Sequence, residues 1–189
     1  MSKGLARTII GNGMRMLRLP IFAAAAIAGL CLFCSGAQTA RMWMPKTDNP
    51  YCSVDTYMLR DVPEQALSTH DSNGVPVIVV NATTLADNPP YGRFLLAHEC
   101  CHHTLGHVGR FESLGQVGPQ PFFYIAPALK QMELDADCCA IKMLKSKNDT
   151  DSIKSAKEMM MSFGSNPTGA YYPTGIERAD NIDKCAAEE

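Results

Sequence analysis

The residues whose types and spacing most clearly indicate a chemical function are two histidines and a glutamate in the sequence His98-Glu99-Cys100-Cys101-His102. A helix turns about 100° per residue, so His98 and His102 lie on one face, about 40° apart. Both imidazoles can then reach one metal ion, with Glu99 beside it. A zinc ion held in this way activates water for hydrolysis. The same spacing also fits a helix that carries two surface histidines.

A second pair of acidic residues extends this pattern. Glu133 and Asp137 stand four residues apart, so a helix presents both carboxylates on one face. Glu133 can be the third zinc ligand, and Asp137 can accept the ring N–H of a ligand histidine. A solvated acidic face is the alternative. We expect His103 and His107 to be surface or supporting residues rather than ligands.

The elements that must position these residues give an α+β fold dominated by helices. Residues 38–71 are polar and rich in turn residues, which indicates an irregular arm with at most one short helix. Residues 72–189 form the main domain, and Pro76 favours an edge position for its strand because proline cannot donate a backbone hydrogen bond. The sequence predicts a strand over 75–81, helices over 91–105, 125–145, 151–163 and 176–185, and a loop over 109–121.

Composition limits the classes of function. The chain has 189 residues, of which 46% are hydrophobic, and this suits one globular domain. Its 17 basic and 19 acidic residues give a net charge of -2, and no run of Lys or Arg stands out. Because binding to phosphate backbones depends on a positive field, nucleic acid is a poor candidate partner.

The N-terminal segment has the pattern of an export signal. Basic residues precede an apolar run over 19–34, and small residues lead up to Ala37. This order predicts a signal peptide over 1–37 and export of the remaining chain, to the periplasm or as a secreted protein. The alternative is a retained anchor, and membrane association is expected only in that case.

Removal of residues 1–37 leaves six of the eight cysteines: Cys52, Cys100, Cys101, Cys138, Cys139 and Cys185. An even number in an exported chain predicts three disulfides. We expect bridges between the two doublets, which would join the two metal-bearing helices, and a bridge between Cys52 and Cys185. The alternative is a non-catalytic protein whose doublet thiolates hold a soft metal ion.

Taken together, the motifs resemble those of a known group. An HExxH sequence followed about thirty residues later by ExxAD resembles the gluzincin zinc peptidases. The similarity is greatest to the CAAX prenyl proteases and their secreted bacterial relatives, which act in quality control of envelope proteins. His107 takes the last place of the HExxHxxxxH form common in that family, and Tyr171–Arg178 resembles its Thr-His-Pro…Glu-Arg stretch.

This resemblance implies a small zinc metalloendopeptidase domain acting on polypeptides. His98, His102 and Glu133 would bind Zn²⁺, with Asp137 supporting a ligand histidine. Glu99 would act as general base, and an edge strand before the HExxH helix would hold the substrate in extended form.

Two further residues are expected near the reacting carbonyl. Tyr172 stands where the relatives usually have a histidine, so Tyr172 or Arg178 would stabilise the oxyanion. A packing role for the tyrosine and a bracing role for Arg178 are the alternatives. A gluzincin fold that has lost activity and serves as a binding module is a further alternative.

Overall fold

The structure is a computed structural model that describes residues 44–60, 62–116 and 122–188. The chain divides into two units, Met1–Arg41 and Met42–Glu189, and every described residue belongs to the second. The predicted signal peptide over 1–37 lies outside the described residues and stays a prediction. Within the described ranges, no helix has both the length and the apolar character needed to cross a membrane.

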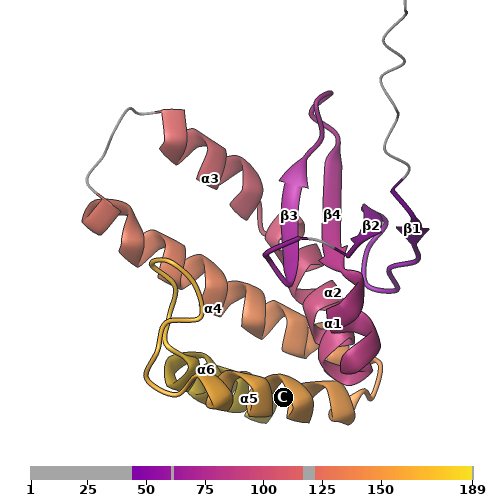
Figure 1. Cartoon of the computed structure of the whole chain (residues 1–189). Coiled ribbons are helices and arrows are strands. Elements are labelled where there is room, and N and C mark those ends of the chain that lie inside the picture. Colours follow the sequence, from indigo (N-terminus) through magenta and orange to yellow (C-terminus); the bar gives the residue numbers. More distant parts are fainter. Residues whose placement is uncertain (1–43, 61, 117–121, 189) are drawn as a thin grey trace, which may run out of the picture. The chain divides into compact units, whose positions relative to one another are not determined.

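Four short strands form a mixed sheet (Figure 1). They are β1 (Lys46–Thr47), β2 (Asp55–Leu59), β3 (Ala66–His70) and β4 (Pro76–Asn81). The strand order is β1-β2-β4-β3, with β2 parallel to β4 and the other two pairs antiparallel. The small sheet confirms the α+β prediction.

The sheet corrects two predictions about the N-terminal part of the domain. Residues 46–70 contribute three strands, so the prediction of an irregular arm is wrong over the described residues. These strands are short, and they are stabilised by pairing within the sheet, with β2 and β3 on β4 and β1 on β2, rather than by a buried alternating pattern. The edge position of the strand before the HExxH helix is also wrong, because β4 pairs on both sides and β3 forms the edge. Pro76 is tolerated because it is the first residue of β4.

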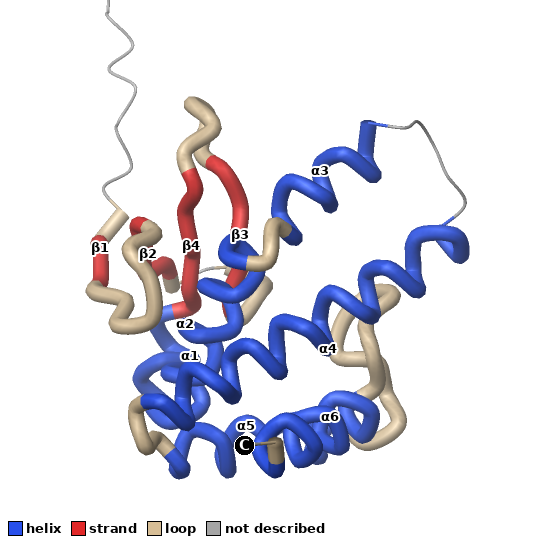
Figure 2. The backbone as a smooth tube through the Cα atoms, turned by 180° about the vertical axis from the view of Figure 1, so that it is seen from behind, coloured by secondary structure: helices blue, strands red, loops and turns tan. Residues whose placement is uncertain are grey.

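Six helices follow the sheet: α1 (Ala82–Asp87), α2 (Pro89–Thr104), α3 (His107–Gln116), α4 (Phe122–Ser146), α5 (Thr150–Phe163) and α6 (Gly175–Ala187). Four agree with the predicted helices to within three residues at each end. The prediction of a loop over 109–121 is wrong for residues 109–116, which belong to α3. Residues 117–121 lie outside the described residues. Figures 1 and 2 show α3 beside β3, on the same side of α4 as the sheet.

Helix α2 is the centre of the core. It is buried without interruption from Phe94 to Cys101, as expected for a helix covered on all sides. On one side, Leu96 and Cys100 pack against Ile78 and Val80 of the sheet. The opposite side packs against α4 and α5 and belongs to a second cluster that also includes α6. The buried residues of this cluster are Tyr91, Phe94, Leu95, Ala97, Cys101, Ala136, Ala140, Ile141, Leu144, Ala156, Met160, Ala179, Ile182 and Cys185.

Side-chain caps fix where the helices begin. The Asn88 side chain accepts from the Tyr91 N–H at 3.2 Å, and prolines fill the first positions of α2. Thr174 and Glu177 form a reciprocal capping box at α6. Asp149 caps α5 by accepting from Ser152 and also pairs with Arg93 of α2, at 2.7 Å.

All six cysteines of the described residues form disulfides, as predicted: Cys52–Cys100, Cys101–Cys139 and Cys138–Cys185. Of the predicted bridges between the doublets, only Cys101–Cys139 is confirmed. The second bridge between the doublets and the Cys52–Cys185 bridge are both wrong, because Cys100 pairs with Cys52 and Cys138 pairs with Cys185. Adjacent residues on a helix point about 100° apart. The two cysteines of each doublet therefore face different neighbours, and only one of them can reach the other doublet.

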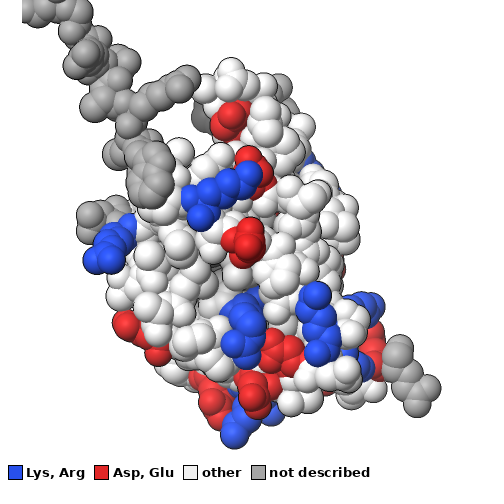
Figure 3. Space-filling model, turned by 90° about the vertical axis from the view of Figure 1, so that its right-hand side faces the viewer, with Lys and Arg blue, Asp and Glu red and all other residues white. Residues whose placement is uncertain are grey.

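Lysines and arginines lie among acidic residues on the face shown in Figure 3, without a continuous basic area. Among the described residues, several basic side chains form ion pairs, including Lys46 with Asp55 at 2.6 Å and Lys157 with Asp183 at 2.6 Å. The absence of a nucleic-acid partner stays a prediction.

The Asp149 cap predicts a pH-dependent stability. Hydrogen bonds from Arg93 and Ser152 lower its pKa to about 2, below the ordinary value of 3.8 for an aspartate. A carboxyl group whose pKa is lower in the folded state than in the unfolded state stabilises the fold at pH values above the unfolded pKa. This stabilisation is lost as the pH falls through the folded pKa.

Asp149→Asn keeps a capping side chain but not the charge. Its free energy of unfolding in urea should fall below wild type at about pH 6, and the gap should close between about pH 4 and pH 2. Asp151→Asn, in the first turn of the same helix, is the control, and an equal pH-dependent gap there would contradict the prediction.

The disulfide pairing predicts both a peptide map and a stability change. Non-reducing digestion should yield the three linked pairs given above. Loss of Cys101–Cys139, which closes a separation of 38 residues, should lower the free energy of unfolding by about 4 kcal/mol, through the unfolded state. The double variant Cys101→Ala/Cys139→Ala avoids a free thiol. Cys138→Ala/Cys185→Ala, with a separation of 47 residues, should cost about as much, and an unchanged denaturation midpoint in both would contradict the pairing.

Candidate metal centre

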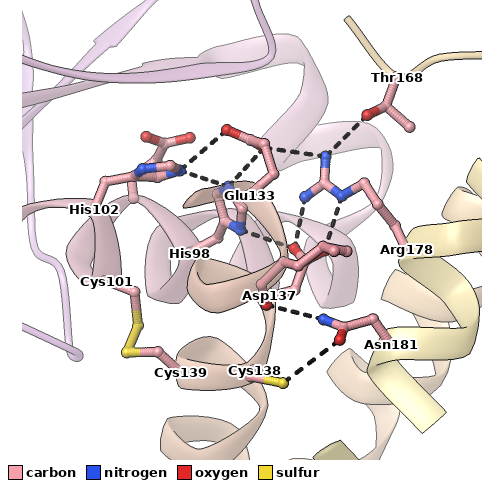
Figure 4. A network of polar contacts seen from close by, with 12 residues as sticks. His98, Cys101, His102, Glu133, Asp137, Cys138, Cys139, Thr168, Arg178 and Asn181 are labelled. Carbon is pink, nitrogen blue, oxygen red and sulfur yellow. Dashed lines mark hydrogen bonds and ion pairs between the residues drawn. A yellow bond between two sulfur atoms is a disulfide. The ribbon is translucent and has the colours of Figure 1, made fainter. Parts of the chain in front are cut away.

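Helices α2 and α4 bring the predicted ligands to one point (Figure 4). Nε2 of His98 lies 3.0 Å from Nε2 of His102, and each of these atoms is 3.4 Å from an oxygen of Glu133. One potential ligand atom from each residue lies within 4.8 Å of the others. Among the described residues this is the group of histidine and carboxylate side chains that could hold a metal ion.

The close approach of the two helices depends on small side chains. Ala97 of α2 and Ala136 and Ala140 of α4 are fully buried between them. The Cys101–Cys139 disulfide joins the same two helices next to the histidines. His98 and Glu133 are 4% and 5% exposed, so the packing that buries them also fixes their directions.

Asp137 fixes the orientation of the His98 ring. Its Oδ1 lies 2.9 Å from Nδ1 of His98, a buried nitrogen that forms no hydrogen bond of regular geometry among the described residues. When Nδ1–H donates to the carboxylate, the lone pair of Nε2 is directed at the metal position. The structure thus brings the predicted supporting residue to its predicted partner.

Arg178 of α6 neutralises Asp137. Its Nε and Nη2 donate to the two carboxylate oxygens at 2.8 and 2.6 Å, and Nη1 donates to Thr168 Oγ1 at 3.2 Å. Nη1 also lies 3.4 Å from Glu133 Oε2. Burial raises the pKa of Asp137, but the charge and hydrogen bonds of Arg178 outweigh burial and hold it at about 2. All three guanidinium nitrogens are engaged, which favours the bracing role over contact with an oxyanion.

The charges around the imidazoles favour a cation. Burial lowers the pKa of His98, but hydrogen bonds to Asp137 and Glu133 and their charges outweigh it and raise the pKa to about 10. Burial and the charge of His98 lower the pKa of His102 to about 3. The carboxylates of Glu133 and Asp137 therefore favour positive charge at the imidazoles. Two imidazoles and a carboxylate in this arrangement could hold a metal ion.

Glu99 lies beside the ligands and is 7% exposed. The Oγ of Ser68, on edge strand β3, lies 2.7 Å from Glu99 Oε2 and 2.8 Å from the Glu99 carbonyl oxygen. Burial raises the pKa of Glu99, against the lowering effects of His98 and Ser68. Sequence reasoning missed Ser68, because a lone serine in a polar segment gives no signal.

A cavity of about 910 Å³ opens in front of these residues. Its lining includes β3, the histidine face of α2, part of α3 and the loop at 168–172. Tyr172 lines this cavity, and burial, together with the charges of Glu133 and Glu99, raises its pKa to about 12. Its phenol is therefore protonated and able to donate at neutral pH. A Cβ on Gly169 would lie 2.7 Å from the Tyr172 ring, so the loop and the ring fit closely.

The remaining histidines lie outside the ligand group. His103 Nε2 lies 3.1 Å from the Val77 carbonyl oxygen. His107 Nδ1 lies 3.2 Å from His102 Nδ1, on the side of that ring opposite Nε2. His70, which carried no signal in the sequence, pairs with Glu112 at 2.7 Å. Because the doublet cysteines are all in disulfides, none is available as a thiolate ligand in this structure.

Comparison with known proteins identifies no relative of this chain. No family model, no curated protein and no solved structure matches the chain. The likeness to gluzincin peptidases consequently stands on the residues and spacings of the chain itself.

The geometry predicts that metal binding at this group depends on His98, with zinc as the test ion. His98→Ala removes one nitrogen ligand and leaves the Asp137 carboxylate facing an apolar side chain. The variant should no longer retain zinc on dialysis, as measured by elemental analysis of the oxidised protein. His103→Ala, on the same helix and bonded to a backbone carbonyl, should retain zinc as the wild type does. Equal zinc content in the His98→Ala protein would contradict the assignment.

Proposed function

We propose that this protein is an exported zinc-dependent metalloendopeptidase. One observation carries the proposal: the buried Glu99 carboxylate shares a cavity with the three-residue group of His98, His102 and Glu133. Zinc held by such ligands supplies Lewis acidity, which lowers the pKa of water and polarises a carbonyl group.

In the proposed reaction, Glu99 accepts a proton from the attacking water and returns it to the leaving amine. Burial raises the pKa of this carboxyl, and a base with a raised pKa holds the transferred proton better near neutral pH. The Ser68 hydroxyl keeps Glu99 aimed into the cavity. Tyr172 donates to the developing oxyanion, and Arg178 braces the Tyr172 loop through Thr168.

The proposed substrate is an extended or unfolded polypeptide. Edge strand β3 pairs with β4 on one side only, and its residues line the cavity. A substrate segment can therefore add to the sheet beside the metal position, with β3 in place of the β4 edge expected from sequence. Leu67 of β3, which is 45% exposed, presents an apolar side chain there.

Export is supported by two features. The chain carries three disulfides, which persist in oxidising compartments. The basic and then apolar N-terminal sequence is typical of a signal peptide. A protease of this kind in the periplasm or outside the cell suits quality control of envelope proteins.

The proposal predicts that a substitution of Glu99 slows hydrolysis without affecting metal binding. Glu99→Gln should keep zinc and a normal unfolding midpoint, but hydrolyse a casein-type substrate about 10²–10⁴ times more slowly, since it cannot accept the proton. Glu112→Gln, the same chemical change on the α3 wall of the cavity, is the matched control and should keep most of the activity.

Full turnover by the Glu99→Gln protein would contradict the role of the base. A zinc-loaded wild-type protein that hydrolyses no unfolded polypeptide, yet binds one in the cavity, would favour the inactive binding module instead.

A further inference from the structure

His107 occupies a position that the proposed reaction does not use. It is the first residue of α3 and is 7% exposed, although most of that helix is accessible. Its Nδ1 lies 3.2 Å from Nδ1 of His102, and the two rings meet edge to face with centroids 5.1 Å apart. Nδ1 of His102 has no other hydrogen-bond partner within the described ranges.

A metal ion on His102 would give this contact a chemical role. A neutral imidazole that gives its Nε2 lone pair to a metal carries its proton on Nδ1. That N–H points away from the metal and, because the His102 side chain is only 14% exposed, is stabilised by a nearby acceptor. The Asp137 carboxylate is this acceptor for His98, at 2.9 Å. Nδ1 of His107 is the corresponding atom for His102.

The backbone between the two helices brings His107 into this place. An unbroken helix would put a residue five positions after His102 about 140° away around the axis. The chain instead leaves α2 at Leu105, and Gly106 adopts the left-handed conformation, with φ of 70°. Glycine takes this conformation without strain, and the turn directs His107 back to the outer edge of the His102 ring.

We infer that His107 is a positioning residue of the metal centre. Its neutral imidazole, with the proton on Nε2, accepts the Nδ1–H of His102 and fixes the ring so that Nε2 faces the metal. The inference rests on the proposed zinc site but not on peptidase activity. The centre then has one carboxylate acceptor and one imidazole acceptor, one for each ligand histidine.

Two substitutions of His107 that have similar shapes test whether its Nδ1 acts as the hydrogen-bond acceptor. His107→Leu places methyl groups at the δ positions, whereas His107→Asn places an amide oxygen where Nδ1 stands. The dissociation constant for Zn²⁺ should be measured with the full oxidised chain by competition with a chromogenic chelator. The leucine variant should bind zinc 10- to 100-fold more weakly, the range seen when outer partners of metal ligands are removed. The asparagine variant should recover most of this loss.

A second readout separates hydrogen bonding from packing. In the ¹⁵N-labelled, zinc-loaded wild-type protein, NMR should show His102 protonated on Nδ1, with a scalar coupling across the hydrogen bond to His107 Nδ1. Equal zinc affinity in the wild-type and leucine proteins, or equal losses for leucine and asparagine, would overturn the inference and leave the metal site standing. A wild-type chain that binds no zinc would overturn both.

Discussion

The arrangement of the whole domain depends on the pairing of one buried charge. Asp137 is completely buried, and a carboxylate in that position is stable only with partners, because desolvation disfavours its charge. It receives two hydrogen bonds from Arg178 of α6 and faces the His98 ring of α2. Arg178 in turn reaches the loop of Thr168. Three helices and one loop are therefore held in position by contacts to a single carboxylate. Removing one member of a buried ion pair such as Asp137–Arg178 lowers the free energy of unfolding by about 3–5 kcal/mol.

The helical half of the fold and the ligand group were predictable from sequence because their patterns are local. The spacing of His98 and His102, and of Glu133 and Asp137, has meaning only on helices, so motif and element support each other. The helix ranges predicted from these patterns agree with the structure to within three residues at each end. The structure adds the partner of each side chain, above all the assignment of Arg178 to Asp137.

The sheet and its contribution to the site could not be predicted, because their stabilisation is non-local. Thr56 and Ser68 belong to polar strands whose pairing with β4 decides their structure. Ser68 acquires its role only when β3 lies beside α2. The same reasoning applies to Cys52, since a cysteine count gives the number of bridges but leaves the pairing open. No specific role for His107 could be predicted from the sequence, because the turn at Gly106, rather than helix periodicity, sets the direction of its side chain.

The order of the disulfides has a consequence for the durability of the chain. Cys100 and Cys101 are neighbours, as are Cys138 and Cys139, so the three bridges follow one another as links of a single covalent chain. This chain joins the segment before β2, then α2, α4 and α6. A cut in the connection between Cys52 and Cys100, or between Cys101 and Cys138, would leave both fragments attached. The chain can thus be nicked in either connection without releasing either half of the candidate metal centre.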